Sequence, residues 1–319
     1  MKTYLKLAGT TFLSVLFMVS CSDDENDGME TPEESYSTTF KMTDAPIDNA
    51  NVEAVFITVS DIKVDGTSLE GFNKTTFDLS ALVNGQTKTL GNIDLAAASY
   101  SNIELVLDYD TDASGNAPGC YVELAGGEKD KLEATANSIT ITDTFEVFAT
   151  STNDVIIDFD LRKTIKEEEG TLSSNFEFVS MSELSAGIRT VNEESTGSIS
   201  GTVNDAENTS DKIIVYAYEK GTFNAETETQ GQGEGNVMFK NAVTSSVVAG
   251  INNSYSLNFL TEGEYELIFV SYNEETEGSG FEFNALLEAE SNTVLDLGAI
   301  SITSALQLDA NVTITGTKS

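Results

Sequence analysis

The sequence predicts an all-β protein with two β-sandwich domains, and three observations support this class. The clearest is a run near the end in which Leu306, Leu308, Ala310, Val312 and Ile314 are each separated by one polar residue. A period of two over five repeats is typical of a strand with one buried and one solvated face. The second is the recurrence of turn dipeptides such as Asn-Gly and Asp-Gly between apolar runs. The third is that no amphipathic helix of useful length follows the first 20 residues, while the remaining length suits two domains.

The first domain is expected at residues 36–191. A turn at residues 43–48 follows its first strand, and residues 52–64 are β-branched and nearly continuous, which predicts a central strand. Asn-Gly at 84–85 predicts a hairpin between residues 75–83 and 87–94. Further strands are expected at 102–108 (with Ile103, Leu105 and Leu107 on one face), 121–124, 138–142, 144–148, 154–161 and within 175–191, with a helical turn in 162–169.

The second domain is expected at residues 196–319. Its first strand is predicted at 197–203, and the strand at 212–218 should turn Ile214, Tyr216 and Tyr218 to one side. Residues 221–235 are polar and glycine-rich, which predicts a mobile loop. Alternating apolar residues then predict two more strands before the final run: Tyr255, Leu257 and Phe259, then Tyr265, Leu267 and Phe269.

Residues 1–20 have the features of a secretory signal peptide. Lys2 and Lys6 precede an apolar stretch at 7–19 that is shorter than the roughly 20 residues a membrane-spanning helix needs. The stretch ends in Met18-Val19-Ser20-Cys21, which resembles the cleavage box of bacterial lipoproteins. The resemblance implies cleavage before Cys21 and lipidation of its sulfur, so that the protein contacts a membrane through this anchor. An ordinary signal peptide with a chance Cys is the alternative.

Residues 21–35 form an acidic segment that contains no Lys or Arg. Like charges and a low apolar content predict a disordered tether. Residues 22–27 (SDDEND) also resemble the export tag of Bacteroidetes surface lipoproteins. That resemblance implies a location on the cell outer membrane, on its extracellular face, whereas a solvated linker is the plain alternative.

Composition excludes several classes of function. The chain has 16 Lys and Arg against 53 Asp and Glu, a formal net charge of −37, which argues against binding nucleic acid. It has no His, which excludes Ser-His-Asp and Cys-His nucleophile arrangements and His-ligated zinc. Cys120 is the only Cys besides Cys21, so we expect it to be a small buried residue rather than half of a disulfide.

Four landmarks occur in order in the first domain: FKMTDAPID at 40–48, VEAVFITV at 52–59, YSNIELVL at 100–107 and VIIDFDLR at 155–162. With these landmarks, residues 36–191 resemble the DUF4382 family, a domain of unknown function found in secreted and lipid-anchored bacterial proteins. The resemblance implies a β-sandwich with no assigned reaction.

The second domain contains five short motifs in order: GSISGTV at 197–203, IIVYAY at 213–218, YSLNF at 255–259, GEYEL at 263–267 and DLGAI at 296–300. With these motifs, residues 196–319 resemble the carboxypeptidase regulatory-like, transthyretin-like β-sandwich. The resemblance implies that the domain is an accessory spacer or interaction module.

Two groups of residues are candidates for a site. Asp108, Asp110 and Asp112 place oxygen ligands at alternate positions before a glycine, a spacing with which a loop can wrap around calcium. An acidic turn is the other interpretation, and no other cofactor is implied.

The second group is a structural turn made of Thr43, Asp44 and Pro46 together with Asp158 and Arg162. If the turn packs near the end of the strand at 154–161, Arg162 is placed to hold one of the carboxylates with two hydrogen bonds. A ligand-binding role for this group is the alternative.

The sequence therefore predicts a lipid-anchored protein of the cell envelope that acts as a non-catalytic binding or scaffold module. Its expected partners are an extracellular protein or polysaccharide. The alternatives are a hydrolase that attacks an extracellular polymer with paired carboxylates and a calcium-stabilised adhesin.

Overall fold

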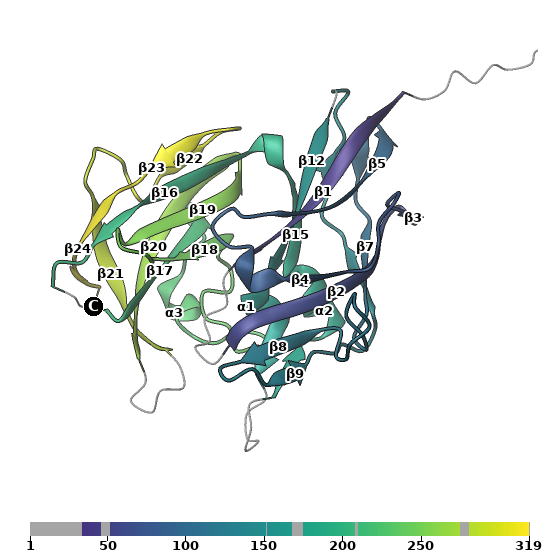
Figure 1. The fold of residues 1–319 in the computed structure, drawn as a ribbon. Coiled ribbons are helices and arrows are strands. Elements are labelled where there is room, and N and C mark those ends of the chain that lie inside the picture. Colours follow the sequence, from purple (N-terminus) through teal and green to yellow (C-terminus); the bar gives the residue numbers. More distant parts are fainter. Residues whose placement is uncertain are drawn as a thin grey trace, which may run out of the picture. The chain divides into compact units, whose positions relative to one another are not determined.

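The computed structural model describes residues 34–45, 52–150, 152–167, 175–207, 210–274 and 281–318. Residues 34–319 form one compact unit, and strands dominate it (Figure 1), so the predicted all-β class with sandwich-like modules is confirmed. No helix among the described residues is long and apolar enough to span a bilayer. The residues predicted to form the signal peptide, Cys21, residues 22–33 of the predicted tether and Pro46 lie outside the described residues.

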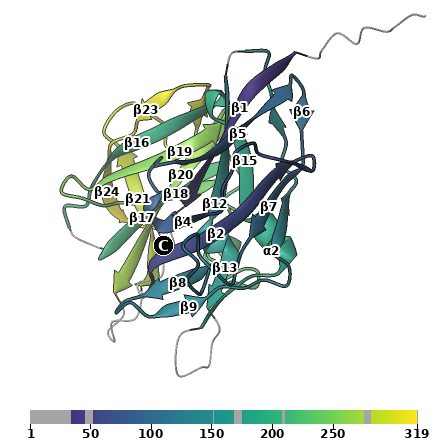
Figure 2. The same cartoon turned by 45° about the vertical axis from the view of Figure 1, so that its right-hand side comes forward.

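The first module contains two main sheets, which Figure 2 shows from a second direction. One is four-stranded, in the order β15-β12-β1-β5, and the other is seven-stranded, in the order β10-β7-β2-β8-β9 with β3 and β4 also paired to β2. β1 runs parallel to β12 and antiparallel to β5. The elements are β1 (Ser35–Ala45), β2 (Val52–Val64), β3 (Thr67–Ser68), β4 (Thr75–Asp78), η1 (Leu79–Ala81), β5 (Lys88–Ala96), β6 (Ser99–Tyr100), β7 (Ile103–Leu107), β8 (Tyr121–Leu124), β9 (Lys129–Lys131), β10 (Ser138–Ile141), β11 (Phe145–Glu146), β12 (Asn153–Asp160), α1 (Leu161–Thr164), β13 (Ile165–Glu167), β14 (Phe176–Phe178), α2 (Met181–Ala186), β15 (Ile188–Asn192) and η2 (Glu193–Ser195).

The core of this module follows the alternation of its strands. β2 has the predicted bounds, and in β7 the side chains of Ile103, Leu105 and Leu107 are buried while those of Glu104 and Val106 are only half-buried. β1 contributes Phe40 and Met42 to the same hydrophobic core, which draws its buried residues only from positions 40–188. The two sheets are thus held together by the faces that the period of two selects.

Two expectations for the first part of this module were wrong. Asn84 and Gly85 do turn the chain with positive φ values of 56° and 78°, but β4 before them pairs with β2 and β5 after them pairs with β1. The turn therefore connects two sheets and forms no hairpin, because each flanking strand finds a longer partner elsewhere. Thr43 and Asp44 belong to strand β1 instead of a turn, because the parallel pairing with β12 continues to Ala45.

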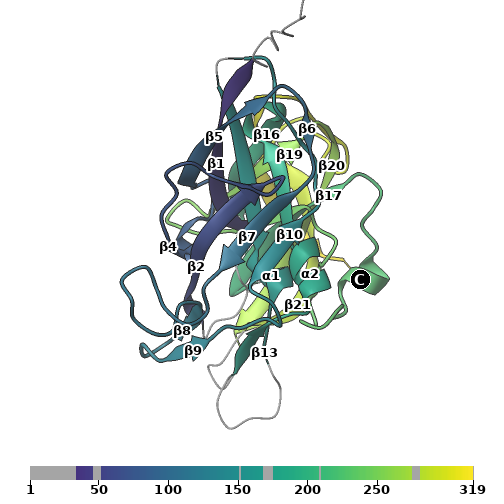
Figure 3. The ribbon, with the colours of Figure 1, turned by 90° about the vertical axis from the view of Figure 1, so that its right-hand side faces the viewer.

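The segment after β12 also differs from the prediction. The expected helical turn is the short α1, which ends after Thr164, and the chain returns to a strand in β13. A second short helix, α2, interrupts the segment where only strands were expected, and it lies beside α1 and β10 (Figure 3). Local sequence did not indicate α2, since Met181 and Leu184 are too few apolar positions to establish a helical period.

The second module is one nine-stranded arrangement. Its path is β18-β17-β20-β21-β24-β16-β19, with β22 paired to β20 and β23 paired to β16. The elements are β16 (Thr196–Asn204), β17 (Lys212–Glu219), α3 (Ala225–Glu228), β18 (Thr244–Val247), β19 (Ser254–Thr261), β20 (Gly263–Glu274), β21 (Phe281–Ser291), β22 (Ile300–Ile302), β23 (Gln307–Asp309) and β24 (Val312–Thr317).

β17 is buried on both faces. Ile214, Tyr216 and Tyr218 lie in one hydrophobic cluster, as their alternation predicted. The intervening apolar residues of the same strand lie in the other cluster. A strand covered on both sides lacks polar residues on either face, which explains why its sequence is nearly continuously apolar.

Three details of the second module correct the sequence interpretation. The segment at 221–235 contains α3, and the buried Glu228 in it accepts hydrogen bonds from Tyr218 and Asn241. Phe259 has a positive φ of 56°, and Leu260 is the residue that enters the core beyond Leu257. The final apolar run is divided between β23 and β24.

Candidate functional site

A wide groove lies in the second module, where strands β20 and β21 separate. They pair from Val270 to Glu274 on β20. Before Val270, β20 pairs with β22 at Gly263–Tyr265, while β21 continues past Leu286 beside β24. The space between the separated strands is about 690 Å³ and is open to solvent. The fork in the sheet thus produces a groove without any insertion in the chain.

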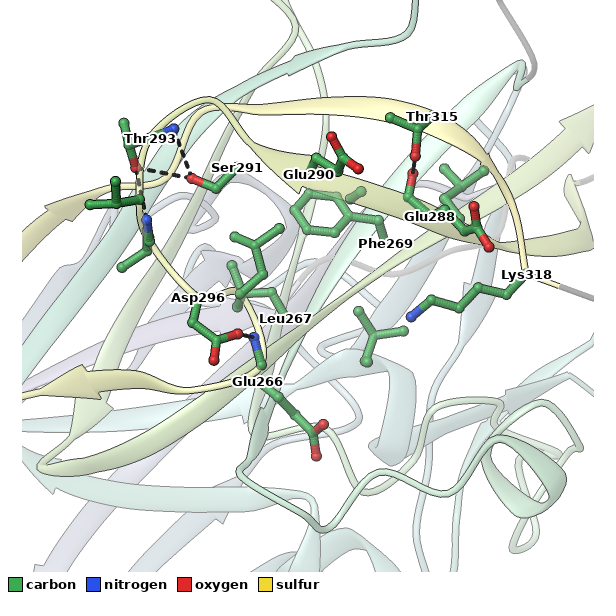
Figure 4. A pocket seen from close by; sticks show the side chains of 17 residues that line it. Glu266, Leu267, Phe269, Glu288, Glu290, Ser291, Thr293, Asp296, Thr315 and Lys318 are labelled. Atoms are coloured by element: carbon green, nitrogen blue, oxygen red, sulfur yellow. Dashed lines mark hydrogen bonds between the residues drawn. The ribbon is translucent and has the colours of Figure 1, made fainter.

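The floor of this groove is apolar (Figure 4). Leu267, Phe269 and Leu287 line it and belong to the hydrophobic core of the module. The loop between β21 and β22 closes one end, held by a hydrogen bond of 2.9 Å from the Leu267 amide to the Leu297 carbonyl. Val294 on this loop is fully exposed, one of two large hydrophobic side chains with that exposure among the described residues. The floor residues themselves are almost fully buried, so the accessible apolar surface of the groove belongs to Val294 and to the half-buried Leu295 and Leu297 of the same loop.

The rim of the groove is acidic. It carries Glu266, Glu288, Glu290 and Asp296 against one cation, Lys318. Glu266 is already engaged, because its Oε1 accepts hydrogen bonds from two backbone amides of the loop after β17, and Asp296 Oδ1 accepts one from the Gly298 amide.

The two glutamates of β21, unlike Glu266 and Asp296, have side chains without such partners among the described residues. Within the described part of the chain, the side chains of Glu288 and Glu290 form no hydrogen bond or ion pair, and both residues are exposed. Figure 4 shows both projecting from β21. Two carboxylates on the rim are therefore unengaged and accessible to a ligand.

The sequence did not identify this groove. In β21 an acidic residue alternates with a less polar one near the end of the strand, and that pattern was the available signal. It indicates only an exposed strand face. The separation of β20 from β21 depends on which strands β22 and β24 choose as partners, which no local pattern specifies.

The predicted turn residues lie elsewhere, in a buried cluster of charges. Arg162 does hold a carboxylate with two hydrogen bonds, but the acceptor is Asp160, through Nε to Oδ1 at 3.1 Å and Nη2 to Oδ2 at 2.7 Å. Asp160 also caps α1 by accepting from the Arg162 amide. Asp44 and Asp158 were the expected acceptors, and Asp160 takes this place because it directly precedes the helix that carries the arginine.

The other two carboxylates have separate partners. Asp158 forms an ion pair with Arg189, with Nη2 and Oδ2 2.7 Å apart. Asp44 Oδ1 accepts a hydrogen bond from the Leu161 amide at 3.1 Å, whereas its Oδ2 is buried without a hydrogen-bond partner in the described residues. Thr43 donates to the carbonyls of Leu82 and Gln86, so these side chains fix backbone and helix ends.

Burial and neighbouring charge act in opposite directions within this cluster. Burial raises the pKa of Asp44 well above its usual value, and the nearby carboxylates of Asp160 and Asp158 add to this effect. Burial alone would also raise the pKa of Asp160, but Arg162 and Lys163 outweigh it and hold that pKa below its usual value. Burial lowers the pKa of Lys163 itself. The cluster therefore favours a charged Asp160 and disfavours a charged Asp44.

The same cluster links the two modules. Arg162 Nη1 donates to the Phe239 carbonyl at 3.4 Å, and Lys163 Nζ donates to the Ala242 carbonyl at 2.9 Å. The guanidinium also lies over the ring of Tyr216, 5.4 Å from its centroid. These contacts give the cluster a structural role, since its charged atoms point to fixed protein groups.

The candidate calcium residues do not converge on one point. Asp108 pairs with Lys74 at 2.7 Å, Asp110 with Lys131 at 3.1 Å, and Asp112 Oδ1 accepts from two amides of its own loop. No group of three or more Cys, Asp or Glu side chains in the described ranges is placed to hold a metal ion. The arrangement therefore gives the calcium prediction no support.

Cys120 is fully buried. Its Sγ accepts a hydrogen bond of 3.3 Å from the Thr58 amide, and burial raises the pKa of the thiol to about 12. A thiol with this pKa is unreactive near neutral pH.

Comparison with known proteins identifies one domain. The family model described as "Domain of unknown function (DUF4382)" matches residues 37–177. The first module therefore contains a DUF4382 domain, as the order of its four landmarks predicted. No curated protein sequence matches the chain.

Among solved structures, the chain is similar to several proteins at low identity and low TM-score. The TIE protein of Bacillus anthracis shares 12% identity with a TM-score of 0.19, over 88% of this chain and 34% of that chain. BcpA, the major pilin subunit of Bacillus cereus, shares 9% with a TM-score of 0.18, over 88% and 70%. GBS52, a minor pilin of Streptococcus agalactiae, shares 9% with a TM-score of 0.20, over 89% and 98%. The chain thus spans about one third of the TIE protein.

Proposed function

We propose that this protein is a lipid-anchored binding or scaffold module of the cell envelope without catalytic activity. The observation that carries the binding role is the groove between β20 and β21, which combines an apolar floor with unengaged carboxylates on its rim. The anchor is proposed from the sequence, in which an apolar stretch ends in Met18-Val19-Ser20-Cys21. Two acyl chains on such a cysteine give stable membrane attachment.

The proposed arrangement assigns a task to each segment. Cys21 holds the chain at the outer membrane, and the acidic segment 22–34, which precedes β1, spans at most about 45 Å as a tether. The DUF4382 domain and the second module, which we propose to be of the carboxypeptidase regulatory-like type, are then presented outside the cell. Their net negative charge keeps them soluble and away from anionic lipid headgroups.

A non-catalytic role is supported by how the buried acids are used. Asp160 is held by Arg162 and Lys163, and Glu228 accepts hydrogen bonds from Tyr218 and Asn241. A hydrolase needs a pair of carboxylates that face a cleft and exchange protons with a substrate. The carboxylates of this groove lie on its exposed rim, where they are suited to binding.

Membrane fractionation of cells that express the full chain tests the anchor. We expect Cys21→Ala to move the protein from the membrane to the soluble fraction and to remove acylation of the mature amino terminus in mass spectra. Cys120→Ala is the matched control, because it changes the other cysteine and should leave attachment intact. Equal attachment of the wild type and Cys21→Ala would refute the anchor. Protease treatment of intact cells then tests the surface location, since protection of the wild-type chain contradicts it.

A further inference from the structure

The fork between β20 and β21 leaves one part of β20 with a strand on a single side. Residues 266–269 pair with β17 on one side, and the groove lies on the other. The loop between β21 and β22 uses one backbone donor of this edge, the Leu267 amide. A segment in extended conformation can pair with such a free strand edge through backbone hydrogen bonds.

The negative charge of the rim determines which side chains a bound peptide must have. Glu288 and Glu290 lie two positions apart on β21, which places them about 7 Å apart along a strand. An extended partner with basic residues at alternate positions presents its cations at the same spacing. Exposed Val294 and the half-buried Leu295 and Leu297 of the same loop offer contacts to the residues between those cations.

The protein's own segments do not meet this requirement. Residues 22–35 contain several acidic residues and no Lys or Arg, so the rim repels this segment. A second copy of the chain carries the same net charge of −37, which opposes self-association through an acidic rim. The occupant must therefore come from another molecule.

We propose that the groove between β20 and β21 binds an extended peptide segment of a partner protein in which basic residues alternate with aliphatic ones. This inference rests on the binding role proposed above and specifies the partner. The cations pair with Glu288 and Glu290, and the aliphatic residues contact Val294 and the half-buried Leu295 and Leu297 of the loop between β21 and β22.

Binding of a labelled octapeptide tests the proposal. The probe alternates lysine and valine, has blocked ends, and is titrated with the purified full chain while fluorescence anisotropy is recorded. We expect saturable binding, and no binding of an octapeptide that alternates glutamate and valine. The double variant Glu288→Gln/Glu290→Gln should weaken binding about tenfold, since each exposed ion pair contributes modestly.

A matched variant separates the groove from the overall charge. Glu219→Gln/Glu282→Gln removes the same two charges from exposed positions outside the groove, and binding should stay within about twofold of the wild type. Equal weakening in both double variants, or no binding of the lysine peptide at all, overturns the proposal. Neither result affects the anchor, because Cys21→Ala measures attachment independently of the groove.

Discussion

Replacing Asp44 by Asn is expected to stabilise the protein increasingly as the pH rises. Asp44 is 6% exposed, and its Oδ2 has no hydrogen-bond partner in the described residues. Burial raises the pKa of the Asp44 carboxyl and therefore favours its protonated form over its ionised form in the folded protein. Asn retains the Oδ1 that accepts from the Leu161 amide, and it has no proton to lose.

The sign of the effect follows from the protons bound in each state. The unfolded chain releases the Asp44 proton near pH 3.9, whereas the native protein holds it to a higher pH. The stabilisation from this group is therefore complete below about pH 4 and is lost as the pH rises through the native pKa. Within that window the free energy of unfolding of the wild type falls by about 1.4 kcal/mol per pH unit because of this one residue.

Urea unfolding of both proteins between pH 4 and pH 8 measures this difference. Other groups that titrate on unfolding contribute equally to both proteins, so subtraction isolates Asp44. Asp65→Asn makes the same change in an exposed turn, and it should stay within about 0.5 kcal/mol of the wild type throughout. A constant difference for Asp44→Asn, or one that falls with pH, would show that Arg162 outweighs burial and would refute the reasoning.

Two further predictions concern close packing and the thiol. A Cβ at Gly201 would lie 2.2 Å from the Ala310 carbonyl oxygen, so Gly201→Ala should lower the free energy of unfolding by about 1–3 kcal/mol in urea titrations. Gly263→Ala is the control, because its Cβ would have its nearest neighbour at 3.6 Å. Equal effects of the two substitutions would contradict the explanation. Cys120, with its pKa raised to about 12, should resist iodoacetamide at pH 8 in the folded Cys21→Ala chain and react once urea unfolds it. Labelling of the folded protein at the rate of a free thiol, followed by mass spectrometry, would contradict this.

Several features of the fold could be predicted because they depend on nearest neighbours in the sequence. The alternation of Ile103, Leu105 and Leu107 selects the buried face of β7 whatever the partner strand is. The β-branched run of β2 gave its bounds for the same reason. Side-chain direction in a strand is set by the backbone, so a period of two survives any choice of topology.

The buried charge cluster was predicted only in part. The sequence connected Arg162 with the residues around positions 44 and 158, and the structure places all of them in one buried region. The acceptor differs because Asp160 both caps α1 and faces the guanidinium. The sequence does not indicate Arg189 as a partner of Asp158, because Arg189 lies opposite Asp158 only through the pairing of β12 with β15.

The sequence by itself determined the all-β class, the strand faces, the acidic character and the DUF4382 domain of this protein, and it predicts the lipid anchor. All of these properties depend on short stretches of sequence or on the overall amino-acid composition. The tertiary structure alone decided that the Asn84-Gly85 turn joins two sheets and that β20 and β21 separate to form the groove. Several strands that are distant in the sequence have a similar local propensity to pair with a given strand. The pairing that forms is the one whose assembled sheets bury the most apolar surface, and local sequence does not contain that information.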